Sequence, residues 1–341
     1  YSESFFNVWI DLMTNWFPTY ALEGLLSNLK NQENLFKNKN FKIMIGENAT
    51  LLNSDLGFIR SVKAKIEKKN IIGLQHSAGH YGYIQDLTSC GQYELSHLDS
   101  MITFGWSKIE SYFPKTNFIP LPCPKLSEMP LKSNYTSQKE INKKNKVDIL
   151  FLSNTFHRFV GIGTSGQSRV DFIDEITNSQ IQLISSISNM KLTINHKPFN
   201  MRFFDLYPNH YKQLANVGGK NYKLINTKQK GLTINLIKTA RIILWDQIGS
   251  GTVECFASKI PTIIYWKRIY SHETEWAKPL IVELEKCGVV ASDPNIVVKQ
   301  INEYLIDPVK WMSEPKRVNA IRNFCDVFAK TDRNWYKIWK N

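Results

Sequence analysis

The chain has 341 residues, of which 43% are hydrophobic, and a formal net charge of +13 at pH 7. This composition excludes a disordered chain, and the length predicts about two domains. No apolar run approaches the ~18 residues of a membrane span, no signal peptide is visible, and the five dispersed cysteines favour a reducing compartment over a zinc site. The positive charge suits a phosphorylated substrate, an anionic membrane face or nucleic acid, although no nucleic-acid motif is present.

The first part of the chain alternates between helices and strands. Residues 1–40 and Leu56–Lys68 have helical spacing, and short strands are expected at Phe41–Gly46, Asn70–Gln75, Met101–Trp106 and Asn117–Leu121. This alternation is typical of a parallel sheet covered by helices. Several prolines and a polar stretch that ends at Lys146 then mark a boundary. We therefore predict a first, Rossmann-like domain over residues 1–135. The basic cluster Lys139–Lys146 is either a solvated linker or a contact with a membrane surface.

A second alternation begins at Val147 and predicts a second Rossmann-like domain over residues 147–315. The expected strands are Val147–Leu152, Lys191–Asn195, a buried strand that begins at Arg241, Ile260–Tyr265 and Val289–Ala291; the expected helices are Val170–Asn189, Leu232–Thr239, one that opens at Thr252, and Ile296–Trp339. The helical segment 316–341 is expected to pack back on the first domain. Two such α/β halves would face each other across a cleft that holds a ligand.

The most informative stretch is the strand–turn–helix segment that runs from Arg241 to Tyr265. Its glycines permit positive φ and leave room for a ligand near the backbone. Its hydroxyl side chains and the start of its helix suit a phosphate, and a glutamate follows at a distance that suits a ribose. The alternative is an ordinary turn with small residues. The predicted nucleotide-binding residues are Asp246, Gly249, Ser250, Gly251, Thr252 and Glu254.

Two loops of the first domain carry candidate catalytic groups. His76 and His80 lie in the loop Gln75–Gly82, directly after a strand, where an imidazole can move protons near neutral pH. Glu94 and Asp99 precede the Met101 strand and are candidates for a general base that a histidine orients. The alternatives are structural histidines in a glycine-rich turn, and an aspartate that caps the turn before the strand.

The second domain adds four charged candidates. His196 and Lys197 lie at the end of a predicted strand, where they suit a phosphate or a carboxylate. Arg169 could bind an anionic sugar in a bidentate manner, and Asp171 could act as a nucleophile or base at the start of a helix. A surface basic pair and a purely structural helix start are the alternatives.

The ordered motifs resemble those of GT-B glycosyltransferases and, more specifically, of bacterial surface-carbohydrate (O-antigen) transferases related to the β-Kdo transferases. The matching segments are Gln75–Gly82, Asp99–Trp106, Ile260–Trp266, Gly288–Val290 and Phe324–Trp339. The first loop departs from the family pattern, because Ser77-Ala78 replace a glycine pair and His80 is inserted before Tyr81. The resemblance implies a GT-B-like fold and a nucleotide-sugar donor such as CMP-Kdo. In such a complex Arg169 would hold the sugar carboxylate.

The site patterns and this resemblance together imply a metal-independent glycosyltransferase without a cofactor. It would transfer a sugar from its nucleotide donor to a bacterial surface glycan, such as O-antigen or capsule, or to a lipid-linked glycan. We expect a cytoplasmic protein, with a peripheral contact to the anionic inner membrane as a further expectation and no nucleic-acid partner. Asp171 is the candidate nucleophile if the anomeric configuration is retained. The alternatives are a nucleotide-sugar epimerase of similar fold and a non-enzymatic polyanion-binding protein.

Overall fold

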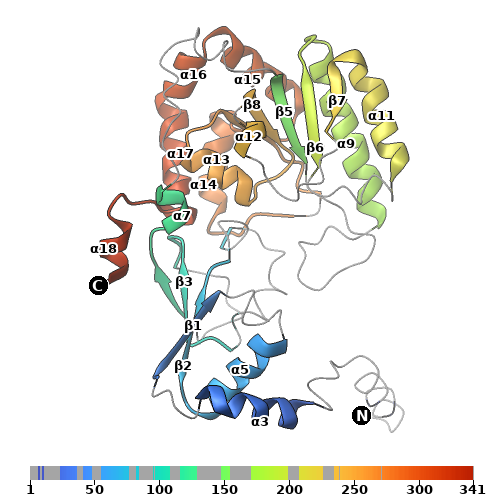
Figure 1. Cartoon of the computed structure of the whole chain (residues 1–341). Helices are drawn as coiled ribbons and strands as arrows, with labels where there is room; N and C mark the ends of the chain where they lie inside the picture. The colour runs from blue at the N-terminus through green and yellow to red at the C-terminus, as the bar shows by residue number, and fades with distance from the viewer. Residues whose placement is uncertain are drawn as a thin grey trace. The chain divides into compact units, whose positions relative to one another are not determined.

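The computed structural model describes residues 7, 10, 24–36, 41–47, 55–76, 82–83, 95, 97–107, 116–128, 147–153, 170–198, 207–225, 234–237, 239–269 and 271–340. The chain divides into two compact units, and Figure 1 shows the elements of each. The first unit comprises Tyr1–His76, Gln92–Ile102 and Tyr112–Phe118, and the second comprises Ser77–Gly91, Thr103–Ser111 and Ile119–Asn341.

The first sheet has four strands in the order β1-β2-β3-β4, with β1 parallel to β2 and β2 parallel to β3. Its strands are β1 (Ile43–Glu47), β2 (Asn70–Leu74), β3 (Ser100–Thr103) and β4 (Asn117–Pro120), and its helices include α3 (Leu25–Phe36) and α5 (Asp55–Ile66). Helix α5 buries Ile59 and Ala64, while β2 buries Ile71 and Gly73. The alternation predicted from the sequence is therefore found.

The second sheet has six parallel strands in the order β10-β9-β8-β5-β6-β7. The strands are β5 (Val147–Ser153), β6 (Ile194–Pro198), β7 (Tyr222–Leu224), β8 (Ala240–Trp245), β9 (Thr262–Tyr265) and β10 (Val290–Ala291). The chain first adds strands on one side of β5 and then returns to add β8 on the other side. This is the doubly wound Rossmann order, and its direction reverses between β5 and β8.

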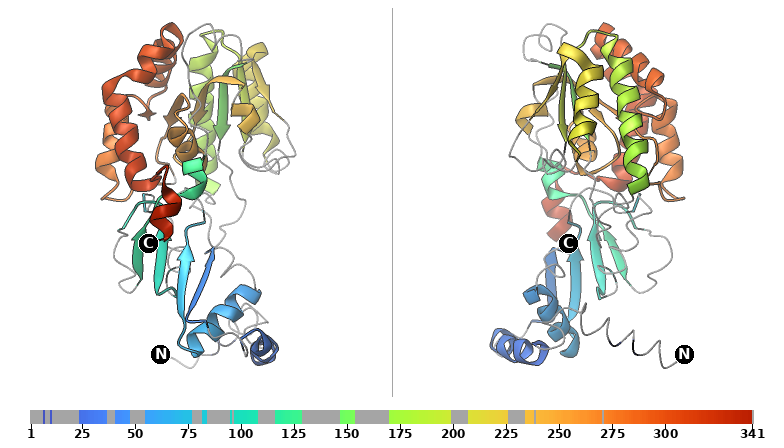
Figure 2. Two further views of the ribbon diagram at one scale, coloured as in Figure 1. Left: turned by 60° about the vertical axis from the view of Figure 1, so that its left-hand side comes forward. Right: turned by 90° about the vertical axis from the view of Figure 1, so that its right-hand side faces the viewer.

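Helices cover both faces of the second sheet. Helices α9 (Val170–Ser188), α11 (Pro208–Gly218), α15 (Pro294–Ile306) and α16 (Pro308–Ser313) share a buried core with Ile149 and Phe151 of β5. Helices α12 (Ile234–Ile237) and α13 (Ser250–Ala257) pack on the other face with Leu150 and Leu152. Figure 2 shows this layering from two further directions. A central strand buried on both faces explains the uninterrupted apolar run of β5.

The helical stretch expected over Ile296–Trp339 is divided in the structure. After α14 (Lys278–Lys286), the chain forms α15, α16, α17 (Pro315–Phe328) and α18 (Trp335–Lys340). Helices α15, α16 and α17 each begin with a proline that follows a carboxylate cap: Asp293, Asp307 and Glu314. Proline fits the first turn of a helix but interrupts a helix that would continue into it, so these Asp-Pro and Glu-Pro pairs set the breaks.

The C-terminal segment is joined to residues from the middle of the chain. The Lys330 N–H donates to the Phe104 carbonyl at 2.9 Å, and its own carbonyl accepts from the Cys123 N–H at 2.8 Å. Helix α18 lies beside α7 (Pro124–Glu128), and the Trp339 indole donates to the Pro122 carbonyl at 2.8 Å. All these residues belong to the second unit. The boundaries 1–135, 147–315 and 316–341 stay a prediction.

Two glycines have positive φ, but a side chain added at one would overlap a neighbouring residue, whereas a side chain added at the other would meet only backbone strain. Gly288 has φ +74°, and a Cβ there would lie 2.5 Å from Gln300, which accepts hydrogen bonds from Trp311 and Arg317. Gly219 has φ +58° with open space around the same position. We expect Gly219→Ala, at φ 58° and ψ −152°, to cost about 1–3 kcal/mol of unfolding free energy, and Gly288→Ala to cost at least ~1 kcal/mol more, because Gln300 must also move. Urea denaturation measures both; equal losses would contradict this difference.

Candidate functional site

The reversal of strand order leaves the carboxyl ends of β5 and β8 as the natural ligand edge of the second sheet. The turn after β8 leads into α13, which begins at Ser250 rather than at Thr252 as expected. Thr252 is fully buried, and its hydroxyl donates to the Gln247 carbonyl at 3.2 Å and accepts from the Gly249 N–H at 3.3 Å. The Thr252 side chain therefore holds the shape of the turn.

The two glycines of this turn do not use positive φ. Gly249 is extended, with φ −161°, and Gly251 lies in the first turn of α13. The positive φ that glycine permits is therefore not used at these positions. Ser250 is the first residue of α13 and is partly exposed. The first N–H groups of a helix have no partner within the helix, and they lie at the positive end of its dipole. The start of α13 thus retains the chemistry predicted for a phosphate.

The neighbours His196 and Lys197 point to opposite faces of the sheet, because side chains alternate along a strand. His196 is fully buried in the face covered by α9 and α11, where its ring lies 4.5 Å from that of Phe151. Its Nε2 contacts the Ser153 hydroxyl at 2.8 Å and its Nδ1 contacts the Tyr222 hydroxyl at 2.6 Å. Burial and the nearby His210 hold the pKa of His196 well below its usual value. A phosphate could reach this ring only if one of these bonds broke.

Lys197 lies on the face that carries α13. It is in register with Leu152 of β5, which packs in the same core as Cys255 of α13. Only 3% of Lys197 is exposed, and burial lowers the pKa of its ammonium because the charged form loses hydration. The structure therefore places a buried cation at the carboxyl edge, on the same face as the phosphate-type turn.

Glu254, the predicted ribose ligand, lies one turn into α13. Its Oε1 accepts from the Lys125 ammonium at 2.6 Å, and its side chain is 19% exposed. The Lys125 side chain is 72% exposed, so the pair lies at the surface of the second unit. A ribose that binds Glu254 would have to share this carboxylate with Lys125 or displace it.

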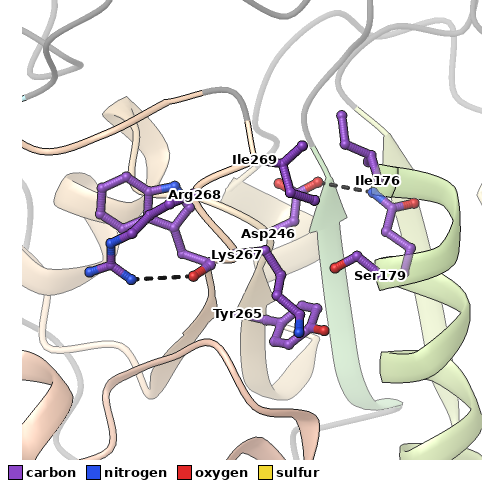
Figure 3. A pocket seen from close by; sticks show the side chains of 9 residues that line it. Ile176, Ser179, Asp246, Tyr265, Lys267, Arg268 and Ile269 are labelled. Carbon is purple, nitrogen blue, oxygen red and sulfur yellow. Dashed lines mark hydrogen bonds between the residues drawn. The ribbon is translucent and has the colours of Figure 1, made fainter. Parts of the chain in front are cut away.

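Asp246 lies on the other face, in a small, open pocket beside α9 and the end of β9 (Figure 3). The lining residues are Ile176, Ser179, Gln180, Asp246, Tyr265, Trp266, Lys267, Arg268 and Ile269. The exposed Lys267 side chain places its ammonium 5.8 Å from the centre of the Tyr265 ring. Arg268 is instead held by Glu273 and Glu285 and lies over Trp266. Lys267 is thus the cation that a ligand in this pocket would meet.

A chain of buried polar groups supports Asp246. Its carboxylate accepts from the Gln180 amide at 3.0 Å, and the Gln180 carbonyl faces His210 Nε2 at 2.9 Å. This arrangement requires the proton of His210 on Nε2, so that Nδ1 faces the Thr177 hydroxyl at 2.9 Å without a proton. Burial lowers the pKa of His210 to about 4, which keeps the ring neutral.

In the first unit, the structure separates two of the predicted catalytic residues. His76 follows β2 at the carboxyl edge, where its Nδ1 lies 2.6 Å from Oε1 of Glu47, the last residue of β1. Asp99 instead precedes β3 at the amino edge, where it accepts from Lys65 at 2.7 Å and from the Ile71 N–H at 2.8 Å. Burial raises the pKa of Asp99, but these hydrogen bonds outweigh it and the net shift is downward. Asp99 therefore caps the start of the strands.

The remaining candidates have no described side chain. His80, Glu94 and Arg169 lie outside the described residues, and of Asp171 only the backbone is described, in the first turn of α9. The sequence interpretation missed Glu47, Gln180 and Lys267. Glu47 and Lys267 share one usable signal, because each lies at or just after the carboxyl end of a parallel strand.

A match to a protein family bears on the function of this site. The model of the LIC12162 family transferases matches residues 1–341. The chain belongs to this family. The transferase activity expected from the sequence motifs is therefore confirmed at the level of the family, while the relation to O-antigen and β-Kdo transferases remains a prediction. A search of curated proteins finds no match to this transferase.

A solved structure with a TM-score above 0.5 confirms the predicted GT-B-like α/β fold with C-terminal helices. A glycosyltransferase from Rickettsia africae ESF-5 aligns with a TM-score of 0.52 and 11% identity, over 96% of this transferase and 82% of that chain. The UDP-GlcNAc 2-epimerase from Neisseria meningitidis bound to UDP-GlcNAc aligns with a TM-score of 0.48 and 13% identity. This alignment covers 96% of this transferase and 84% of that chain. MurG from Acinetobacter baumannii aligns with a TM-score of 0.44 and 9% identity, over 93% of this transferase and 76% of that chain.

Within the part of the transferase that the structure describes, no helix is both long enough and apolar enough to cross a bilayer.

The neutral state of His210 predicts acid sensitivity. Its pKa is about 4 in the folded protein, below the usual value of 6.5, so the unfolded chain binds the extra proton between these values. The resulting stability is fully present above pH 6.5 and is lost as the pH falls towards 4, by roughly 3 kcal/mol at most. We expect His210→Gln to flatten this part of the stability profile in urea denaturation, while exposed His272→Gln leaves it unchanged. An unchanged slope in His210→Gln would refute the assignment.

Proposed function

We propose that this transferase is a glycosyltransferase that moves a sugar from a nucleotide donor to a glycan acceptor. The observation that carries the proposal is the buried Lys197 ammonium at the carboxyl edge, on the sheet face where α13 begins. Membership of a transferase family and the GT-B-like fold support it. An ammonium group at this edge can donate charge-assisted hydrogen bonds to the phosphate of a nucleotide donor.

The second unit would bind the donor through its phosphate. Lys197 would neutralise charge on the departing phosphate, and Ser250 with the first N–H groups of α13 would donate hydrogen bonds to it. Donors fixed in place before the reaction favour the transition state, where negative charge on the leaving group grows. Because a phosphate favours the charged form of Lys197, donor binding would also raise the pKa that burial lowers.

The first unit would supply the general base. Glu47 accepts from Nδ1–H of His76, which leaves Nε2 as the basic nitrogen for an acceptor hydroxyl. A carboxylate in this position fixes the tautomer and stabilises the imidazolium that forms. This proposal replaces the pairing of His76 with Asp99, since Asp99 lies at the amino edge and is bonded to Lys65. A nucleophilic Asp171 remains the proposal for the case of retained configuration.

The donor is proposed to be CMP-Kdo or a related acidic nucleotide sugar, and the acceptor a bacterial surface glycan or its lipid-linked precursor. The sequence resemblance supports this assignment, and the net charge of +13 suits acidic partners. A thermal-shift screen of CMP, UDP, GDP and their sugars tests it, because a ligand of the native state raises the melting temperature. Conversion of the donor without an acceptor would favour an epimerase instead. Binding that ignores the nucleotide but falls steeply with salt would favour a polyanion-binding protein.

Lys197→Met should weaken donor binding while keeping the volume of the side chain. We expect the dissociation constant in titration calorimetry to rise about 10- to 100-fold, which is typical when a charged hydrogen-bond partner is lost. The matched control is Lys223→Met, which removes an exposed lysine from the neighbouring strand β7. Equal affinity of Lys197→Met and the native protein would end the phosphate assignment.

His76→Ala should lower kcat by about 10²- to 10⁴-fold, because a general base contributes a factor of this size. Glu47→Gln should lower kcat by about 10-fold, since it removes only the orienting carboxylate. Donor affinity should stay unchanged in both variants, and exposed His272→Ala serves as the control. A kcat for His76→Ala within a factor of about two of the native value would show that His76 is not the base.

A further inference from the structure

The last described residues form an aromatic and basic surface, here called the C-terminal aromatic–basic segment (residues 330–340). It contains α18, which lies beside α7 in the second unit (Figure 2). Its exposed basic residues are Lys330, Arg333, Lys337 and Lys340, and its large apolar residues are Trp335, Tyr336, Ile338 and Trp339. Four cations and four large apolar side chains therefore share eleven residues.

Two hydrogen bonds fix the orientation of this segment. The Trp339 indole donates to the Pro122 carbonyl at 2.8 Å, and the Asp332 N–H donates to the Ser127 hydroxyl at 3.1 Å. The helix is thereby held by one edge, and other side chains remain in solvent. Tyr336 is 54% exposed and Ile338 is 38% exposed. The exposure of these side chains thus follows from how the helix is attached.

The positive charge of the segment is not neutralised within the described chain. None of its four basic side chains forms an ion pair with a carboxylate of a described residue. Asp332 is the one acidic residue between 330 and 340, and its carboxylate accepts from the Asn334 N–H at 2.6 Å. The Lys337 ammonium lies 6.0 Å from the centre of the Tyr336 ring, so an apolar ring and a cation face solvent together.

From this combination we infer that the C-terminal aromatic–basic segment docks the protein on an anionic phospholipid surface. Tryptophan and tyrosine favour the interface between headgroups and acyl chains, and basic residues near them attract anionic headgroups. A second copy of the chain is a poor occupant, because a symmetric contact would bring the same four cations against each other. This inference does not depend on the proposed function, since the segment includes neither Lys197 nor His76.

Co-sedimentation with lipid vesicles tests the inference on the whole protein. We expect binding to vesicles of phosphatidylcholine mixed with phosphatidylglycerol, weaker binding at high salt, and little binding to phosphatidylcholine alone. The double variant Lys337→Glu/Lys340→Glu should bind at least about tenfold more weakly. The double variant Tyr336→Ser/Ile338→Ser should also bind more weakly, even at low salt, because it removes the side chains that would enter the interface.

Matched controls alter equally exposed residues elsewhere in the second unit. Ile306 is 78% exposed and Val309 is 44% exposed, so Ile306→Ser/Val309→Ser removes apolar surface of the same kind; Lys299→Glu/Lys316→Glu reverses two other exposed lysines. Both controls should retain native binding, and melting temperatures show that every variant is folded. Absence of binding by the native protein, or equal losses in controls and segment variants, would overturn the inference. So would sedimentation velocity showing a dimer that only the segment variants abolish.

Discussion

The reversal of strand order between β5 and β8 is the constraint on which the rest of the second unit depends. Chain connections leave this point in opposite directions, so the carboxyl edge between the two strands is not crossed by a connection. The turn into α13 and the buried Lys197 both meet this edge. The place at which the donor phosphate is proposed to bind therefore depends on the order of the strands as much as on the residue types present there.

Side chains alternate between the two faces along β6, so two consecutive residues have different roles: His196 a structural one and Lys197 the proposed functional one. His196 is used in the core, where Ser153 and Tyr222 satisfy its ring and burial keeps it neutral. Lys197 faces the opposite side, near α13. His210 repeats the structural pattern through Gln180 and Asp246. The second unit thus stabilises its interior with neutral imidazoles and keeps a buried lysine at its edge.

The sequence predicted the fold well because the buried strands leave a strong pattern. The apolar run of β5 and the strand–turn–helix around Thr252 are local signals, and both elements are found close to their expected places. The site was harder to predict because it depends on direction in space. The motif places His196 and Lys197 side by side, whereas successive side chains of a strand point to opposite faces of the sheet. Asp99 and His76 are both candidates for the catalytic site by their chemistry, but a residue before a parallel strand lies at the opposite edge of the sheet from a residue after one. Glu47 carries no motif, and only the pairing of β1 with β2 shows its role.

Hydrogen bonds of Lys330 to Phe104 and Cys123 have a consequence for biosynthesis. A ribosome releases the chain from its N-terminus, so the partners of Lys330 emerge more than two hundred residues before it. The second unit therefore cannot complete its backbone bonding until Lys330 has left the exit tunnel. Until then Phe104 and Cys123 lack their hydrogen bonds to Lys330, and an incompletely bonded nascent chain is open to chaperones and to aggregation.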